Sequence, residues 1–196
     1  MLARFLDDNT LEKLRLAMPS EYWLPLWVSL ETGLRVGDVC ALRRDQLDGC
    51  RLSYLAAKTG KQGTAELSPE LAAELRRNSR GRYLFPSPRS YREHLTRQAI
   101  WARVKRAAHK AGIPPEGVSP HSLRKVYAVR LYRQRGLRAA QEALQHDRTE
   151  TTELYALSDY LAPENLDKPI RRRELGIVTK LVAEEIKIAL DKSSGA

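Results

Sequence analysis

The sequence is poor in cysteine and has no long apolar run, and each absence excludes a class of protein. Two cysteines, Cys40 and Cys50, occur among 196 residues, with no Cys-X-X-Cys pair. Neither a disulfide framework nor a zinc site is therefore expected, and a reducing cytoplasm fits. No stretch approaches the roughly eighteen apolar residues of a membrane span. The N-terminal MLARFLDDNT turns acidic too early for a signal peptide, so we expect no membrane association.

Acidic residues are outnumbered: 24 Asp and Glu stand against 34 Lys and Arg, which gives a formal net charge of +10. A polyanion is therefore the first partner to expect. The alternative is a surface that is merely basic, and charge alone does not separate the two. The hydrophobic fraction of 42% is enough to bury a core.

The first part of the sequence predicts helices that lead into a hairpin. Apolar residues recur at helical spacing from residue 8 to about 45, with Gly33 as a stop and a short helix over 36–44 after it. The stretch RLSYLAAKTGKQGTAEL, residues 51–67, has two short apolar runs around a Gly-Lys-Gln-Gly centre. This is typical of a β-hairpin with a loop longer than two residues, and it puts Lys58 at the end of the first strand.

Two later helices carry the same start signal. Ser68 with Pro69, and Ser119 with Pro120, supply a capping hydroxyl followed by a proline suited to the first helical position. Gly136 is expected to end the helix that begins at Ser119, and a short helix LRAAQEALQ is expected after it.

The remaining segments complete the prediction of fold class. Residues 83–88 are expected to be extended, about 94–111 a long helix, and about 174–191 an amphipathic helix. We find no internal repeat. The sequence therefore predicts an α+β, mostly helical single domain with one small antiparallel sheet.

Several cationic side chains fall at the ends of predicted elements. His121 and Arg124, three residues apart at a helix start, project from one face near the positive end of the helix dipole, which suits an anion. Arg35 lies at the seam between two helices, where a rigidly held guanidinium can present its fork to phosphate. A structural role is the alternative for each: a surface cap for the His-Arg pair, and a salt bridge with Asp38 for Arg35. Lys58 could be an ordinary basic residue on a solvated edge.

Together with a tyrosine, these groups fit phosphoryl transfer to a phenol oxygen. Tyrosine is a poor nucleophile, with about one phenol in a thousand ionised at neutral pH if its pKa is near 10. Two arginines and hydrogen-bonding histidines would stabilise a pentacoordinate phosphate as magnesium does in other enzymes. A lysine could protonate the leaving oxygen. The stretch LQHDRTETTELY offers His146 and Tyr155, nine residues apart.

Four motifs carry a resemblance: TGLRVGDVCAL, AAKTGK, SPHSLRK and LQHDRTETTELY, in that order from residue 32 to 155. In order, spacing and hairpin placement they resemble the active-site motifs of the tyrosine recombinase (phage integrase) family. The resemblance covers essentially that family's whole catalytic domain and implies its fold. The positions that match the family's active site are Arg35, Lys58, His121, Arg124, His146 and Tyr155.

The resemblance implies that Tyr155 attacks the scissile phosphate to give a 3′-phosphotyrosyl enzyme and a free 5′-hydroxyl. Arg35 and Arg124 would clamp the phosphate. Attack by a partner strand's 5′-hydroxyl then reverses the chemistry on a new strand. Because the phosphotyrosine retains the bond energy, neither ATP, a metal nor another cofactor is expected.

It implies a proton-transfer or hydrogen-bonding role for the other three residues. His121 would act as general base toward the tyrosine or hydrogen-bond the phosphate. His146 would donate to a phosphate oxygen. Lys58 would be the general acid for the leaving 5′-oxygen.

The sequence departs from the family's pattern at three positions. Asp38 stands where the family usually has glutamate, and Lys125 where a second histidine often follows the arginine. Gln145 replaces the usual glycine before His146, and because glutamine resists backbone angles that glycine permits, the turn there is expected to differ. Three further residues are assigned to packing or to the surface: Tyr160, His94 and His109.

We expect residues 1–170 to form the tyrosine recombinase catalytic domain. Residues 171–196 would supply a basic linker, the amphipathic helix and a disordered tail. The core-binding domain that many family members carry is expected to be absent, either because the chain belongs to a short branch or because it is a fragment.

Double-stranded DNA is the expected partner, bound largely through its backbone phosphates. The resemblance implies a monomer in solution that assembles to a tetramer on synapsed DNA, in the cytoplasm with the nucleoid. The C-terminal helix would dock on a neighbouring protomer or on its own domain. The expected DNA contacts are Lys61, Arg103, Lys105, Arg106, Lys125 and Arg130, with the arginines at 171–173.

Two alternatives to a recombinase share the same residues. One is a type IB topoisomerase-like enzyme, which nicks and rejoins DNA without a partner protomer. The other is a DNA-binding regulator that has the fold but no turnover, against which the presence of all six expected residue types argues.

Overall fold

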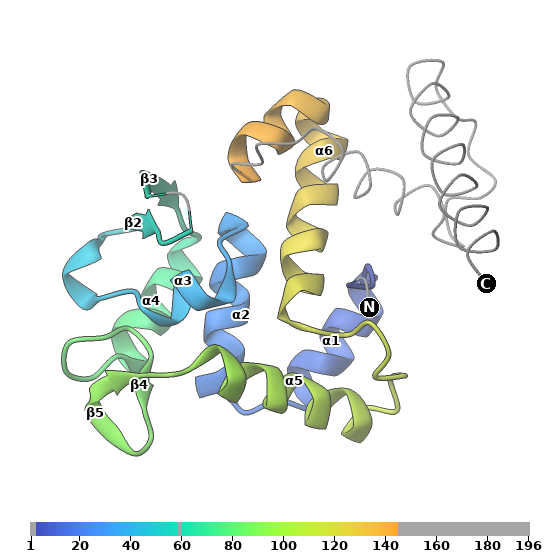
Figure 1. Ribbon diagram of the computed structural model, residues 1–196, viewed down its shortest axis with the longest axis horizontal. Coiled ribbons are helices and arrows are strands. Elements are labelled where there is room, and N and C mark those ends of the chain that lie inside the picture. The colour runs from blue at the N-terminus through green and yellow to red at the C-terminus, as the bar shows by residue number, and fades with distance from the viewer. Residues whose placement is uncertain (1–2, 59, 145–196) are drawn as a thin grey trace, which may run out of the picture. The chain divides into compact units, whose positions relative to one another are not determined.

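The computed structural model describes residues 3–58 and 60–144. Its contacts divide the chain into two compact units, Met1–Tyr127 and Ala128–Ala196, and each is described by itself. The first unit, coloured blue to yellow in Figure 1, holds most of the described residues. Of the second, the structure describes only the continuation of one helix.

The first unit is mostly helical, with two small antiparallel sheets, which confirms the predicted α+β class (Figure 1). The helices are α1 (Asp8–Leu16), α2 (Ser20–Thr32), α3 (Val36–Cys40), α4 (Pro69–Asn78), α5 (Arg97–Lys110) and α6 (Pro120–Leu144), which continues into the second unit. One sheet has the order β1 (Leu47–Asp48), β2 (Arg51–Ala56), β3 (Lys61–Glu66), after the 3₁₀ turn η1 (Arg44–Gln46). The other pairs β4 (Pro86–Ser87) with β5 (Ser90–His94). None of the described helices combines the length and apolarity needed to cross a bilayer.

α2 is the central helix of the unit. It packs against α3 and α4, and α5 packs against α1 and α3. Its sequence SEYWLPLWVSLET has apolar residues around most of its circumference, as a helix covered on several sides requires. The side chains of Leu26 and Val28 are completely buried in the core that these helices share with β2.

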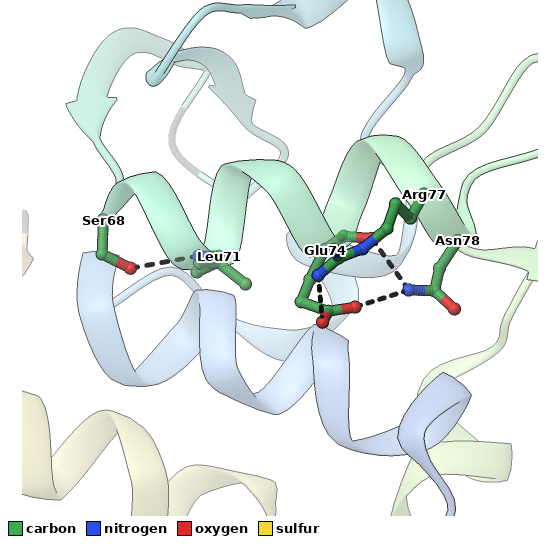
Figure 2. Close-up of polar contacts among 5 residues, drawn as sticks. All are labelled: Ser68, Leu71, Glu74, Arg77 and Asn78. Atoms are coloured by element: carbon green, nitrogen blue, oxygen red, sulfur yellow. Dashed lines mark hydrogen bonds and ion pairs between the residues drawn. The ribbon is translucent and has the colours of Figure 1, made fainter.

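α4 follows the hairpin and begins at the predicted signal. The Ser68 hydroxyl accepts a hydrogen bond from the Leu71 N–H, and Pro69 is the first helical residue (Figure 2). At the other end, the Glu74 carboxylate accepts from Arg77 and from the Asn78 amide, as Figure 2 also shows. Both ends of the helix are therefore held by local side-chain contacts.

The predicted elements are confirmed in most places and wrong in three. The helix expected over 94–111 begins at Arg97, because residues 90–94 form β5, a strand in a second sheet that was not predicted. The helix expected over 36–44 ends at Cys40. Gly136 does not end α6, which runs on to Leu144 through the segment expected to be a separate helix. A glycine inside a helix costs about 1 kcal/mol relative to alanine, which a helix with good formers on both sides can absorb.

Candidate active site

Arg35 is presented by a tight turn between α2 and α3. Gly33 ends α2 in the left-handed conformation, with φ 69°, and its N–H donates to the Ser29 carbonyl at 2.9 Å. The buried Thr32 hydroxyl donates to the Val28 carbonyl and accepts from the Leu34 N–H. The buried Ser29 hydroxyl donates to the Leu34 carbonyl at 2.7 Å. Because side chains satisfy the turn's backbone groups, the half-buried Arg35 starts from a fixed backbone.

Arg124 fastens α6 to this turn. Its side chain is only 5% exposed, so its charge must be hydrogen-bonded inside the protein. One guanidinium nitrogen, Nη1, donates to the carbonyl oxygen of Gly33, two residues before Arg35. The two predicted clamp arginines, 89 residues apart in sequence by their numbers, therefore meet at one turn.

His121 lies one turn before Arg124 on α6, near the N-terminus of the helix. The pKa of His121 is lowered from the usual 6.5, chiefly because partial burial removes water from the charged imidazolium. The side chain still keeps contact with solvent. The positive charges of Arg124, Arg35 and Arg97 lower it further. Arg35 and Arg124 thus lie close enough to His121 for their charges to favour its neutral form.

Arg97 is a fourth member of this cluster and was missed by the sequence analysis. It is the first residue of α5, and its exposed side chain has no hydrogen bond or ion pair with any other described residue. No local signal could have found it, because its nearness to His121 depends on how α5 and α6 pack. Thr96 caps α5, because its hydroxyl accepts a hydrogen bond from the Ala99 N–H, and this cap fixes Arg97 as the first residue of the helix.

Lys58 lies in the turn of the β2–β3 hairpin, two residues beyond the end of β2. The strands pair antiparallel from Arg51↔Glu66 to Ala56↔Lys61. The neighbouring Ala57 N–H donates to Oδ1 of Asp38 on α3, at 3.2 Å. The structure therefore ties the hairpin turn to the helix that Arg35 precedes, and Asp38 forms this bond rather than the ion pair with Arg35 considered as an alternative.

Two of the six predicted active-site residues, His146 and Tyr155, lie outside the described residues, as do Gln145, Tyr160 and the C-terminal segment 171–196. Their roles stay predictions. The histidines assigned to packing or to the surface are described: the ring of His94 packs edge-on against Tyr83 with centroids 5.1 Å apart, and His109 is exposed on α5.

Some of the predicted DNA-contact residues have hydrogen bonds to other parts of the protein, and some are exposed. Arg103 donates to the Tyr22 hydroxyl and covers its ring. Lys105 donates to the Pro115 carbonyl, and the half-buried Lys125 donates to the Ala3 carbonyl. Burial lowers the pKa of Lys125. The exposed ones are Lys61 on β3, Arg106 on α5 and, in the second unit, Arg130.

Other features of the first unit lie outside this cluster. A hollow of about 490 Å³ is lined by arginines of η1, α4 and the α4–β4 loop, and by none of the predicted site residues. Burial raises the pKa of the Cys40 thiol to about 12, so this thiol is not a nucleophile. Among the residues described, no group of three or more His, Cys, Asp and Glu side chains is placed to hold a metal ion.

The arrangement is suited to binding an anion. Arg124 is hydrogen-bonded to the turn that precedes Arg35, the positive charges of Arg35, Arg97 and Arg124 act on the His121 imidazole, and Lys58 lies in a hairpin turn that is bonded to α3. Such a set of donors can bind the non-bridging oxygens of a phosphodiester and stabilise added negative charge.

The fold is that of a tyrosine recombinase catalytic domain. The phage integrase family profile matches residues 4–161, and the chain belongs to that family. The resemblance inferred from the motifs is therefore confirmed.

Individual relatives agree. The tyrosine recombinase XerA of Thermococcus kodakarensis is 31% identical over 161 residues, which span 78% of this chain and 54% of the relative. Among solved structures, a lambda integrase dimer bound to a COC′ core site has a TM-score of 0.68 at 20% identity, covering 88% of this chain and 51% of that one. A lambda integrase tetramer bound to a Holliday junction also has 0.68, at 22% identity, with 79% and 48% covered. The structural likeness concerns the fold, and the chain spans about half the length of these proteins.

Proposed function

We propose that this chain is the catalytic part of a site-specific DNA recombinase, which cleaves and rejoins DNA strands through a 3′-phosphotyrosyl intermediate. The observation that carries the proposal is that Arg124 is hydrogen-bonded to the turn that presents Arg35, while the charges of both arginines act on His121. Membership of the phage integrase family supports the reaction type.

In the proposed cleavage step, the Tyr155 oxygen forms a bond to phosphorus while the bond from phosphorus to the 5′-oxygen breaks. Arg35 and Arg124 hold the non-bridging oxygens and stabilise the pentacoordinate transition state. The phenol proton passes to His121, whose lowered pKa keeps the imidazole neutral and able to accept it. The leaving 5′-oxygen takes its proton from Lys58, and His146 donates a hydrogen bond to the phosphate. Arg97 would add positive charge beside His121.

Rejoining reverses these steps with the 5′-hydroxyl of another strand. The proposed partner is therefore double-stranded DNA, and the reaction takes place in the cytoplasm. Protomers would assemble on the two DNA sites when these are brought together in a synapse. A relative by fold forms a tetramer on a Holliday junction, which supports a tetramer here as well. Docking of the C-terminal helix between protomers is part of this proposal.

Covalent trapping tests the proposal. A DNA duplex with a nick one or a few nucleotides beyond the cleavage site loses the short 5′-hydroxyl fragment by diffusion, so the enzyme stays attached to the 3′-phosphate. The full chain should give a protein–DNA adduct resistant to denaturant, and Tyr155→Phe should give none. Candidate sites come from inverted repeats near the coding locus. An adduct that persists in Tyr155→Phe would overturn the assignment of the nucleophile, and a wild-type chain that forms no adduct on any such site would overturn the function.

A further inference from the structure

The hairpin that carries Lys58 is fastened at both ends to the segment that presents Arg35. At its base, Glu31 in the last turn of α2 accepts hydrogen bonds from the Ser68 N–H at 2.8 Å and the Ser68 hydroxyl at 2.7 Å. Glu31 also accepts from the Trp27 indole at 2.7 Å. Ser68 follows the end of β3 after one residue, so this half-buried carboxylate fixes the position of the hairpin's base against α2.

At the turn of the hairpin, Asp38 makes the second attachment. Its Oδ1 accepts from the Ala57 N–H, the residue immediately before Lys58. The turn closes through the Gly60 N–H, which donates to the Ala56 carbonyl at 2.8 Å, with Gly60 at φ 67°. Asp38 is the third residue of α3, and Arg35 is the N-cap of the same helix. The short helix α3 therefore connects the hairpin turn that contains Lys58 to Arg35.

We propose that Asp38 is a positioning residue for proton transfer, which holds Lys58 where it can protonate the leaving 5′-oxygen. This inference rests on the proposed function. A charge-assisted hydrogen bond from a backbone N–H to a carboxylate is short-range and directional, so it sets the turn's position as well as its stability. Asp38 itself touches no reacting atom. Its side-chain length matters, because glutamate would move the carboxylate by about 1.5 Å, one carbon–carbon bond.

The chemistry of the leaving group makes the idea testable. When the bond between phosphorus and the 5′-oxygen breaks, the electron pair goes to the oxygen, which then takes the Lys58 proton. If sulfur replaces that bridging oxygen, the leaving group departs as a thiolate, which is a far weaker base and needs no proton. A defect in Lys58 positioning should therefore vanish on the sulfur substrate, whereas a defect in phosphate binding should remain.

The experiment measures single-turnover cleavage by the full chain on the nicked duplex, with oxygen or with sulfur at the bridging 5′ position. Asp38→Ala should slow cleavage of the oxygen substrate by at least about 10-fold, a part of the 10²- to 10⁴-fold that general acid catalysis typically supplies. On the sulfur substrate it should cleave at the wild-type rate. Asp38→Asn keeps an oxygen acceptor and should retain most of the oxygen-substrate rate, and Asp38→Glu should lie between Asn and Ala.

Three controls make the outcomes separable. Lys58→Ala should behave as a more severe Asp38→Ala, and Arg35→Ala should be slow on both substrates. Asp48→Ala, at an exposed acid on β1, should change neither rate. An equal loss on both substrates for a folded Asp38→Ala protein, checked by thermal melting, would overturn the positioning role. If Asp38→Ala melts early, Asp38→Asn and Asp38→Glu carry the same test. Failure of the proposed function looks different, because the wild type would then cleave neither substrate.

Discussion

At the scale of single residues, the charge state of His121 decides whether it can serve as a base. Burial and three arginines all disfavour its protonated form, so its pKa lies below 6.5. The neutral form then dominates above that pH, and the cleavage rate should be flat from about pH 6.5 upward and fall in acid. Because the unfolded chain binds the proton more tightly, protonation also destabilises the fold as the pH drops below 6.5.

Arg97 provides the test of this electrostatic cluster. Removing its charge in Arg97→Gln should raise the pKa of His121 toward 6.5, since one of the cations that disfavour the imidazolium is removed. NMR titration of the histidine ring protons measures this, with His121→Gln used to assign the resonance. Arg106→Gln, farther along the same helix, is the matched control and should leave the pKa unchanged. An unmoved His121 pKa in Arg97→Gln would remove Arg97 from the cluster.

At the scale of elements, the α2–α3 turn is the feature on which the site depends. Thr32→Val keeps the side-chain shape but leaves the buried Leu34 N–H without its acceptor and the Val28 carbonyl without its extra donor. Leaving a buried donor unsatisfied costs about 1–3 kcal/mol, so the free energy of unfolding should fall by that amount. Urea denaturation measures it. Thr64→Val, at an exposed position in β3, should have little effect, and a Thr32→Val loss as small as this control's would contradict the role given to the turn.

Elements governed by local signals were predictable from the sequence. The Gly33 stop, the Ser68-Pro69 start and the β2–β3 hairpin each depend on residues within a few positions, and the structure confirms all three. The helix end predicted at Gly136 was wrong because a glycine inside a helix costs only about 1 kcal/mol relative to alanine, and the flanking residues favour helix. β5 was missed because SYREH has no alternating apolar pattern, and its pairing with β4 comes from the turn between them.

The sequence motifs predicted candidate site residues, but not the hydrogen bonds that hold them in place. The motifs predicted Arg35, Lys58, His121 and Arg124 as site residues, but not that Arg124 reaches the Gly33 carbonyl or that Asp38 bonds the hairpin turn. Such hydrogen bonds join residues 91 and 19 positions apart, and no local pattern encodes them. The same holds for the cations expected to contact DNA, since intramolecular partners of Arg103 and Lys105 emerge only from packing.

At the scale of the whole molecule, the net charge of +10 predicts DNA affinity that falls steeply with salt, and the structure separates the cations that should contribute. The side chains of Lys61 and Arg106 are exposed and have no hydrogen bond or ion pair with the described residues, so they can reach phosphates. Arg103 and Lys105 are bonded to Tyr22 and Pro115 within the protein.

This separation gives a paired comparison. In the Lys61→Ala/Arg106→Ala double variant, the slope of log affinity against log salt should become shallower, by about 0.9 for each DNA phosphate that the protein no longer neutralises. The Arg103→Ala/Lys105→Ala variant removes the same charge, but its main effect should be a lower melting temperature, with the salt slope close to wild type. Fluorescence anisotropy on a labelled duplex between about 50 and 200 mM salt, the range over which such interactions weaken strongly, measures both slopes. Equal slopes for the two variants would show that net charge, and not the placement of free cations, governs binding.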